Sequence, residues 1–395
     1  MPRFEPFTAL RYAATLPLDL VAAPPYDVLS DDDIERLRAR HPTNIVHVDV
    51  PLDADGPDRY TSAAALLASW IDQGVLVRDR SPSFTLYRMR FTDATGTPRR
   101  TVGVLGALEV VDEGAGGVLP HERTTPKAKT DRLDLTRATH SNLSPVWGLS
   151  LTAGLTAVLD EPGEPLGECR DEHGVVHTVE RVADPARVEA IRRAVSANPV
   201  LIADGHHRYA ISRTYRDEQR AAHGDAGGAA LTLTYVAELV EDQLSIDAIH
   251  RLYSGLPAST ILEHLSRSFD LAPAGPVDAT VAGELRRRGA LCLVHPDGTG
   301  TWLTPRPAAF AGVRDLDGAL LEHALDGLEV DVTYQHGIDE VRRLVTSGRA
   351  DAAVLIRPTG IDEIRRTADE RLLMPPKSTF FTPKLRTGLV IRPID

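Results

Sequence analysis

Hydrophobic and polar residues recur along the chain with two different periods, which predict a mixture of helices and strands. Ala64, Leu67 and Ile71 recur at helical spacing and predict a helix over residues 60–73. The apolar residues at 44–49 predict a strand before it. A strand followed by a helix is the first sign of an α/β arrangement.

Local signals mark further elements. Ser30 is predicted to cap a helix with an acidic first turn, in which Asp33 stands at the capping-box position. Apolar and polar residues alternate over 83–111, on both sides of a turn at residues 93–96, which predicts a β-hairpin. The same criteria predict strands at 146–158, 231–239, 290–294 and 352–356, a helix from 184 to 197, and helices near Ile261, Leu316 and Ile338.

The succession of these elements predicts an α/β (α+β) protein with mixed sheets. A chain of 395 residues, 42% of them hydrophobic, is long enough for two or more buried cores. Two prolines and a glycine within residues 161–165 resist regular structure. We therefore expect two domains, an N-terminal α/β domain over 1–160 and a C-terminal α/β domain over 161–395.

The charge balance limits the possible partners. A formal net charge of -12 opposes broad binding to nucleic acid or anionic membranes. Cys169 and Cys292 lie far apart, so neither a disulfide framework nor a cysteine metal site is expected. With neither an apolar run of membrane-spanning length nor a basic-then-apolar start, the sequence predicts a cytoplasmic location.

The strongest candidate for chemistry is the pentapeptide Asp-Gly-His-His-Arg at residues 204–208. It lies between the apolar run 200–203 and the helical stretch 209–222. At such a junction the first amides of the helix are unpaired and the helix dipole is positive, so an anion can bind there. The sequence therefore predicts a phosphate-binding element.

Each residue of the pentapeptide fits this interpretation. Gly205 allows a ligand oxygen to approach the main chain, and Arg208 offers a planar fork to two phosphate oxygens. His206 and His207 can donate hydrogen bonds near neutral pH, and Asp204 can accept a proton or hold a metal-bound phosphate. The alternatives are a solvated turn with Asp204 as a helix cap, and a metal site. Adjacent histidines entering a helix point about 100° apart, which opposes a metal site.

Two other segments carry charges suited to phosphate. Glu122 lies between His121 and Arg123, after a glycine-rich loop at residues 114–117. A basic helix ending near His140 follows, whose alternative interpretation is a solvated helix face. Its cations are Lys127, Lys129, Arg132 and Arg137.

The C-terminal segment between two proline-containing stretches carries Lys377, Ser378, Thr379 and Lys384. We expect this tail to return to the active site, and the alternative is an extended tail that packs its two phenylalanines into the core. Tyr26 and Asp27 follow two prolines, a rigid turn that suits either a cleft edge or plain scaffolding. Asn142 and Ser144 are candidates for contacting a substrate amine or carboxylate, or for shaping the turn before Pro145.

Four motifs in order along the chain resemble the family called domain of unknown function 1015 (DUF1015), whose name implies no function. The motifs are residues 22–28 (AAPPYDV), 120–124 (PHERT) with Lys129, Asp131, Arg132 and 142–145 (NLSP), 203–209 (ADGHHRY) and 374–381 (MPPKSTFF).

The pentapeptide also resembles the phosphate-binding motif of the ParB/sulfiredoxin-like fold, which includes nucleotide-dependent free serine kinases. This resemblance implies a ParB/sulfiredoxin-like core, with residues 205–208 on nucleotide or substrate phosphates and Asp204 assisting the chemistry. A separate glutamate is the base in those kinases, and Glu122 is the candidate here.

The resulting hypothesis is a phosphotransferase that acts between ATP or ADP, with Mg²⁺, and a small hydroxylated metabolite, with serine and phosphoserine the first pair to test. The alternatives are a phosphomonoester phosphatase and a non-catalytic nucleotide-binding regulatory protein. No metal ligand from protein side chains is predicted. The predicted catalytic residues are Glu122, Asp204 and His206, and the predicted phosphate or nucleotide contacts are Gly205, His206, His207, Arg208, His121, Arg123, Lys129, Arg132, Lys377, Ser378 and Thr379.

Overall fold

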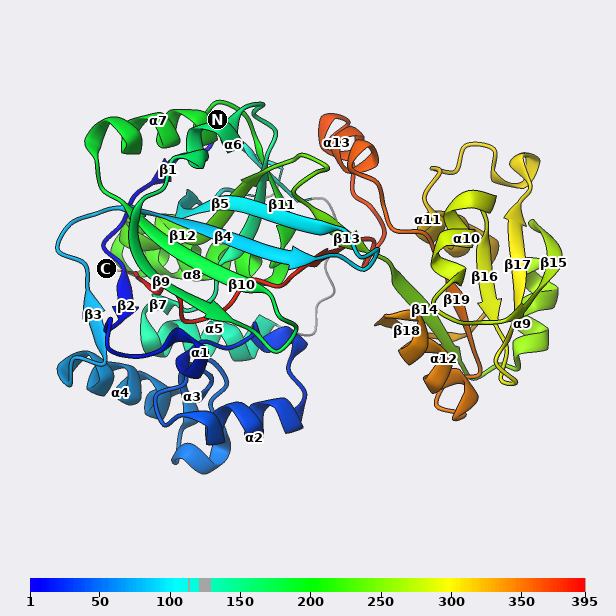
Figure 1. Ribbon diagram of the computed structural model, residues 1–395, viewed down its shortest axis with the longest axis horizontal. Helices are drawn as coiled ribbons and strands as arrows, with labels where there is room; N and C mark the ends of the chain where they lie inside the picture. The colour runs from blue at the N-terminus through cyan, green and yellow to red at the C-terminus, as the bar shows by residue number, and fades with distance from the viewer. Residues whose placement is uncertain (113, 121–128, 395) are drawn as a thin grey trace. The chain divides into compact units, whose positions relative to one another are not determined.

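The computed structural model describes residues 1–112, 114–120 and 129–394. The chain divides into two compact units (Figure 1). Unit 1 consists of Met1–Ser245 together with Thr382–Asp395, and unit 2 consists of Ile246–Phe381. The chain crosses between the units twice, near the short strands β13 (Ser245–Asp247) and β20 (Phe380–Thr382).

A mixed sheet forms the centre of unit 1. Its strands run in the order β6-β11-β8-β12-β5-β4-β10-β9, and β1 pairs with β5. The pairs β11·β6 and β12·β8 are parallel, and the other neighbours are antiparallel. The strands are β1 (Phe4–Glu5), β4 (Phe84–Thr92), β5 (Pro98–Glu109), β6 (Val118–Pro120), β8 (Val146–Ser150), β9 (Glu164–Arg170), β10 (Val176–Val182), β11 (Val200–Asp204) and β12 (Leu231–Glu238).

Two helices, α6 (Leu155–Asp160) and α7 (Pro185–Ser196), pack on this sheet through a core that includes Leu155, Ile191 and Val200. The predicted helix at 184–197 and the hairpin β4–β5 are confirmed. The strand predicted at 146–158 is wrong in its second half, where α6 forms. The carboxylate of Glu238 accepts hydrogen bonds from the amides of Gly154 and Thr156, at 2.8 and 2.7 Å, and so caps α6 from a distant strand.

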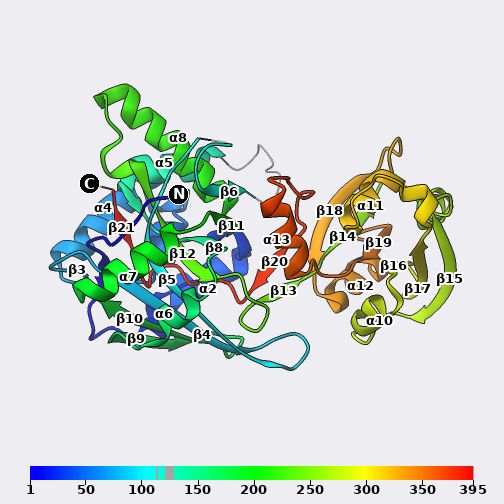
Figure 2. The same cartoon turned by 90° about the horizontal axis from the view of Figure 1, so that it is seen from above.

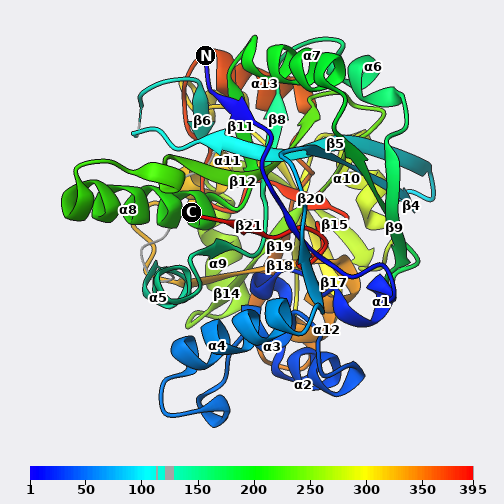
Figure 3. The same cartoon turned by 90° about the vertical axis from the view of Figure 1, so that its left-hand side faces the viewer.

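Short helices form a second part of unit 1, with their own core (Figure 3). The Ser30–Asp33 capping box is present, as predicted. The strand predicted at 44–49 is wrong, because α3 forms there. The buried Asn44 accepts a hydrogen bond from the Val46 amide at 3.0 Å and donates to the Leu20 carbonyl at 2.7 Å, which bends the chain into a turn. The elements are β2 (Leu10–Tyr12), α1 (Leu18–Val21), α2 (Asp31–Arg40), α3 (Val46–Asp49), α4 (Arg59–Asp72) and β3 (Leu76–Arg78).

Helices α5 (Lys129–Thr139) and α8 (His206–His223) lie side by side (Figures 2 and 3). Leu133 packs in one apolar cluster with Ile211 and Tyr215, and α5 and α8 are further joined by the ion pair of Arg137 with Glu218. After α5, β7 (Ser141–Asn142) pairs with β21 (Arg392–Pro393), so the end of the chain returns to this region.

Unit 2 contains an antiparallel sheet with strand order β15-β17-β16-β19-β14-β18. Most helices of unit 2 pack against this sheet through two apolar clusters. The strands and helices predicted in this region are confirmed. The elements are β14 (Ile249–Ser254), α9 (Ala258–Leu265), β15 (Phe269–Pro276), α10 (Val281–Arg288), β16 (Leu291–Val294), β17 (Thr299–Pro305), α11 (Asp317–Ala324), β18 (Asp331–His336), α12 (Ile338–Thr346), β19 (Ala352–Leu355) and α13 (Ile361–Asp369).

The division of the chain differs from the boundary expected at residue 160. The proline-rich segment 161–165 joins α6 to β9 inside unit 1. Strands from both sides of it pair with each other, as β4 does with β10, and the buried Arg88 forms an ion pair with Glu180 at 3.2 Å. Pairing between strands that are far apart in the sequence leaves no pattern in the local sequence. The prolines at 161–165 do leave one, and it suggested a domain boundary.

The fold is a mixed α/β arrangement in two units, as the sequence predicts. Among the described residues, no helix combines the length and the apolar character needed to cross a lipid bilayer.

Candidate functional site

The predicted strand-to-helix junction is present in unit 1, where β11 ends at Asp204 and α8 begins at His206. A bulge between Ile202 and Asp204 in the pairing with β8 changes the direction of the strand just before the junction. Gly205 is the N-cap residue, with a φ of 83° and no side chain to offer to the first-turn amides. The positive end of the dipole of this 18-residue helix lies at Gly205.

Asp204 lies between two cations. Its Oδ2 accepts a hydrogen bond from Arg208 Nη2 at 3.0 Å, and its Oδ1 lies 3.3 Å from Lys384 Nζ. Burial would raise the pKa of Asp204, but Lys384, Arg208 and His206 together hold it well below its usual range. Asp204 is therefore ionised and already paired, which makes it a weak proton acceptor.

Arg208 is largely engaged by the protein itself. Its side chain is 10% exposed, Nη1 donates to the Pro145 carbonyl, and Nη2 lies 4.0 Å from Asp27 as well as bonding Asp204. Burial would lower the pKa of Arg208, but Asp27 and Asp204 raise it, so the guanidinium stays charged. Among the described residues, Arg208 Nε has no hydrogen-bond partner. The fork expected to face phosphate thus also holds Asp204 in place.

The tail returns to this site at Lys384, as expected. The Arg386 amide, two residues on, donates to the buried Tyr87 hydroxyl at 3.1 Å. The same hydroxyl contacts His177 Nδ1 at 2.8 Å, and His177 Nε2 lies 3.1 Å from Asp171. This buried chain of hydrogen bonds fixes the segment that brings Lys384 to Asp204.

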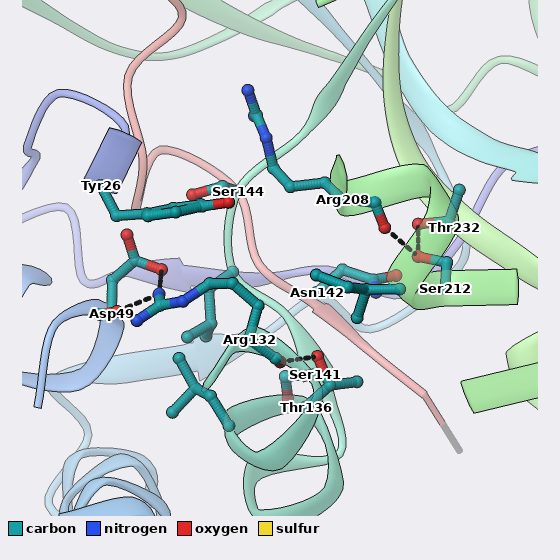
Figure 4. Close-up of a pocket in the computed structure, with 13 residues that line it drawn as sticks. Tyr26, Asp49, Arg132, Thr136, Ser141, Asn142, Ser144, Arg208, Ser212 and Thr232 are labelled. Carbon is teal, nitrogen blue, oxygen red and sulfur yellow. Dashed lines mark hydrogen bonds and ion pairs between the residues drawn. The ribbon is translucent and has the colours of Figure 1, made fainter. Parts of the chain in front are cut away.

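A small cavity of about 50 Å³, lined by both polar and apolar side chains, adjoins Arg208. Figure 4 shows Tyr26, Asp49 and Arg132 on one side of it and Asn142, Ser212 and Thr232 on the other. Tyr26, Arg132 and Asn142 belong to two of the sequence motifs, and Arg208, from a third motif, also lines the cavity. The cavity is far below the 300–1,000 Å³ of ordinary ligand pockets, so it does not hold a whole nucleotide.

Arg132 is held firmly in the cavity wall. It lies over the Tyr26 ring at 4.3 Å, donates to the Asp49 main-chain carbonyl, and its Nε contacts Asp131 Oδ2 at 2.7 Å. The structure therefore joins two motifs through one buried cation. Its predicted contact with phosphate stays a prediction.

The remaining predicted residues lie elsewhere. His121, Glu122 and Arg123 fall outside the described residues, and so does the side chain of Lys129 at the start of α5. Lys377 and the buried Ser378 and Thr379 belong to unit 2, where Ser378 Oγ donates to the Pro375 carbonyl at 2.8 Å. The roles assigned to these seven residues stay predictions, and so do those of the half-buried His206 and His207.

Comparisons with known proteins bear on this arrangement. A family model described as "Protein of unknown function (DUF1015)" matches residues 4–322. The chain belongs to the DUF1015 family. The match includes the three motifs that meet at Arg208 and the cavity, and it confirms the family that the sequence resembles. No curated protein matches the chain.

Solved structures show only a distant likeness to this DUF1015 chain. A conserved hypothetical protein from Pyrococcus furiosus shares 12% identity at a TM-score of 0.38, over 69% of this chain and 92% of its own. A free serine kinase in complex with AMP shares 13% identity at a TM-score of 0.38, and the match covers 69% of this chain and 89% of the kinase. SbnI with C-terminal truncation from Staphylococcus aureus shares 13% identity at a TM-score of 0.39, and the match covers 73% of this chain and 87% of SbnI. Likenesses at these scores do not carry a function from one chain to another.

Sequence reasoning missed part of this DUF1015 site. The sequence left Tyr26 and Asp27 open between a cleft edge and plain scaffolding, and the structure places them beside Arg132 and Arg208. No sequence pattern indicated Asp49 as a site residue, because the segment 44–49 was interpreted as a strand. Among the described residues, no group of three His, Cys, Asp or Glu side chains is arranged to hold a metal ion.

Gly205→Ala tests the junction. Gly205 and Gly224, at the two ends of α8, have φ values of 83° and 77°, and alanine at either should cost about 1–2 kcal/mol through strain. An added Cβ would lie 3.0 Å from Arg208 Cζ and Nε at residue 205, but has no neighbour within 4 Å at residue 224. We expect Gly205→Ala to be the more destabilising in urea unfolding. Equal losses would show that Gly205 and Arg208 are not coupled.

Proposed function

We propose that this protein transfers a phosphoryl group between ATP or ADP and a small hydroxylated metabolite, with serine and phosphoserine as the first pair to test. The observation that carries this proposal is the set of positive groups at one point of unit 1. Arg208, Lys384 and the start of α8 surround Asp204. Phosphoryl transfer depends on positioning and positive charge around the moving group, which these residues supply.

In this proposal the first turn of α8 binds the phosphates. Gly205 lets a phosphate oxygen approach the main chain, and His206, His207 and Arg208 donate to it. Further contacts would come from His121, Arg123, Lys129 and Arg132.

The proposed proton acceptor is a carboxylate. The sequence offers Glu122 and Asp204, with His206 as a further catalytic candidate. Because both oxygens of Asp204 lie within 3.3 Å of a cation, its better role is to hold Lys384 and Arg208 in position. Glu122 is the stronger of the two sequence candidates.

Mg²⁺ is proposed to enter with the nucleotide. Asp204 does not suit a metal ion by itself, since Lys384 and Arg208 already occupy its oxygens and would repel the ion. A divalent ion bound to the nucleotide would neutralise phosphate charge during transfer. The residues of this chain would then position the phosphates.

Nucleotide binding and phosphoryl transfer can be measured separately. ATP or ADP with Mg²⁺ should raise the melting temperature, and phosphoserine should form from L-serine and ATP. If Glu122 is the proton acceptor, Glu122→Gln should leave the thermal shift unchanged and slow transfer about 100-fold or more, whereas the exposed Glu241→Gln should change neither.

Other outcomes would identify the alternatives. Release of phosphate from phosphoserine without nucleotide would indicate a phosphatase. A thermal shift with ATP but no phosphorylated product from any acceptor would indicate a nucleotide-binding regulatory protein. Neither a shift nor a product would overturn the proposal.

A further inference from the structure

The cavity beside Arg208 is too small for a nucleotide but suits part of a small metabolite. A single water needs roughly 10–15 Å³ of such space, so a cavity of about 50 Å³ accepts about four non-hydrogen atoms. That is the size of a hydroxymethyl group with its nearest substituents. Arg208 lines this cavity and also bonds Asp204, so one guanidinium is shared by the cavity and the proposed phosphate site.

Asp49 supplies a carboxylate to the wall of this cavity. It is the last residue of α3, and its side chain is 5% exposed. Arg132 Nη1 lies 3.5 Å from Asp49 Oδ1 and donates mainly to the Asp49 main-chain carbonyl. The carboxylate is thus buried against a cation that is only loosely bonded to it.

Three aspartates lie near Arg208, and they differ in what they can do. Asp204 has a cation on each oxygen. Asp27 is 42% exposed and is not part of the cavity wall. Burial has the largest effect on the pKa of Asp49 and raises it. Arg132 and Arg208 lower this pKa, Asp27 and Asp131 raise it, and its net shift is upward. A general base works best when its proton affinity approaches that needed at the operating pH.

Two further groups in the wall could orient a polar substituent. The Asn142 Oδ1 accepts hydrogen bonds from the Leu233 amide and from Arg392 Nη1, both at 3.1 Å, which leaves its NH₂ group as the donor. The Tyr26 ring is held by Arg132 at 4.3 Å. These fixed groups favour a short, polar substrate over an apolar one.

We propose that this cavity is the acceptor subsite of the phosphotransferase, and that Asp49, in place of Glu122, accepts the proton of the metabolite hydroxyl. The inference rests on the proposed function. In the forward direction the acceptor oxygen forms a bond to the terminal phosphorus of ATP. The bond from that phosphorus to the bridging oxygen breaks, ADP leaves with the electron pair, and the hydroxyl proton passes to the Asp49 carboxylate.

Asp49→Asn tests the catalytic part, with Asp131→Asn as the matched control. Asp131 holds the same Arg132 but is 43% exposed and lies outside the cavity wall. With L-serine and MgATP, we expect Asp49→Asn to reduce kcat by about 100-fold or more with an unchanged ATP thermal shift, and Asp131→Asn to stay within about fivefold of wild type. A kcat for Asp49→Asn within fivefold of wild type overturns the inference. An equal loss in both variants also overturns it, since Asp49 would then act only through Arg132.

Binding tests the subsite without turnover. Thr136→Met fills the cavity from α5, and the exposed Thr214→Met on α8 is its control. L-Serine, glycerol and ethanolamine are titrated calorimetrically into the full chain. We expect at least one of them to bind wild type and Thr214→Met, and its affinity to fall at least tenfold in Thr136→Met. Binding of no probe, or equal binding to all three proteins, overturns the subsite. Acceptor binding without phosphoryl transfer would instead refute the proposed function and leave the subsite standing.

Discussion

Arg208→Ala is expected to lower the free energy of unfolding of unit 1 by about 3–5 kcal/mol, as happens when one partner of a buried ion pair is removed. The variant deletes the hydrogen bonds to the Pro145 carbonyl and to Asp204, and leaves Asp204 with Lys384 as its nearest cation. Urea unfolding measures the loss.

The same variant should also abolish phosphate binding. The ATP thermal shift should disappear at temperatures where the variant is still folded, because the charge nearest the start of α8 is gone. Arg208→Lys is the control, since it keeps a charge but not the fork that reaches Pro145 and Asp204 together. We expect it to recover part of the stability and little of the binding. Wild-type stability and turnover in Arg208→Ala would refute the assignment of the site.

Lys384→Met is expected to cost about 2 kcal/mol at neutral pH, between the values for exposed and fully buried ion pairs. Methionine keeps the apolar stem of the side chain and removes the charge that lies 3.3 Å from Asp204. Comparison with Asp204→Asn and with the double variant isolates the coupling between the two residues. Additive losses would show that the ion pair does not hold the tail in place.

The cost of Lys384→Met should depend on pH in a defined direction. The pKa of Asp204 in the folded protein lies below its unfolded value of about 3.9. Its contribution to stability is therefore complete well above pH 3.9 and is lost as the pH falls through that value toward the folded pKa. We expect the difference between wild type and Lys384→Met to shrink below about pH 4. An unchanged difference at pH 3 would show that Asp204 is not the group involved.

The charges of the site have a consequence for ligand binding. Arg208 and Lys384 are each paired with Asp204, and Asp27 lies 4.0 Å from Arg208. A phosphate arriving at α8 would share these cations with the two carboxylates. Its binding energy therefore depends on the helix amides and on a partial exchange of partners, which a thermal shift measured against ionic strength would report.

Several features of this protein follow from short stretches of sequence. Ser30 and Asp33 form their capping box, Pro185 begins its helix, and the hairpin turns at residues 93–96. The strand, glycine and helix around Gly205 also form where the sequence predicts them. In each case the interacting groups lie within a few residues of one another, so the local sequence contains the complete interaction.

The sequence by itself determined these local elements, the family and the position of the α8 junction. The tertiary structure decided what surrounds that junction. Lys384 is 180 residues from Asp204 along the chain. Asp49 forms part of a helix instead of a strand because the buried Asn44 bonds to Leu20, and it faces a cavity shared with Arg132 and Arg208. Such contacts depend on how distant segments pack, and the period of hydrophobic residues along the chain contains no information about them.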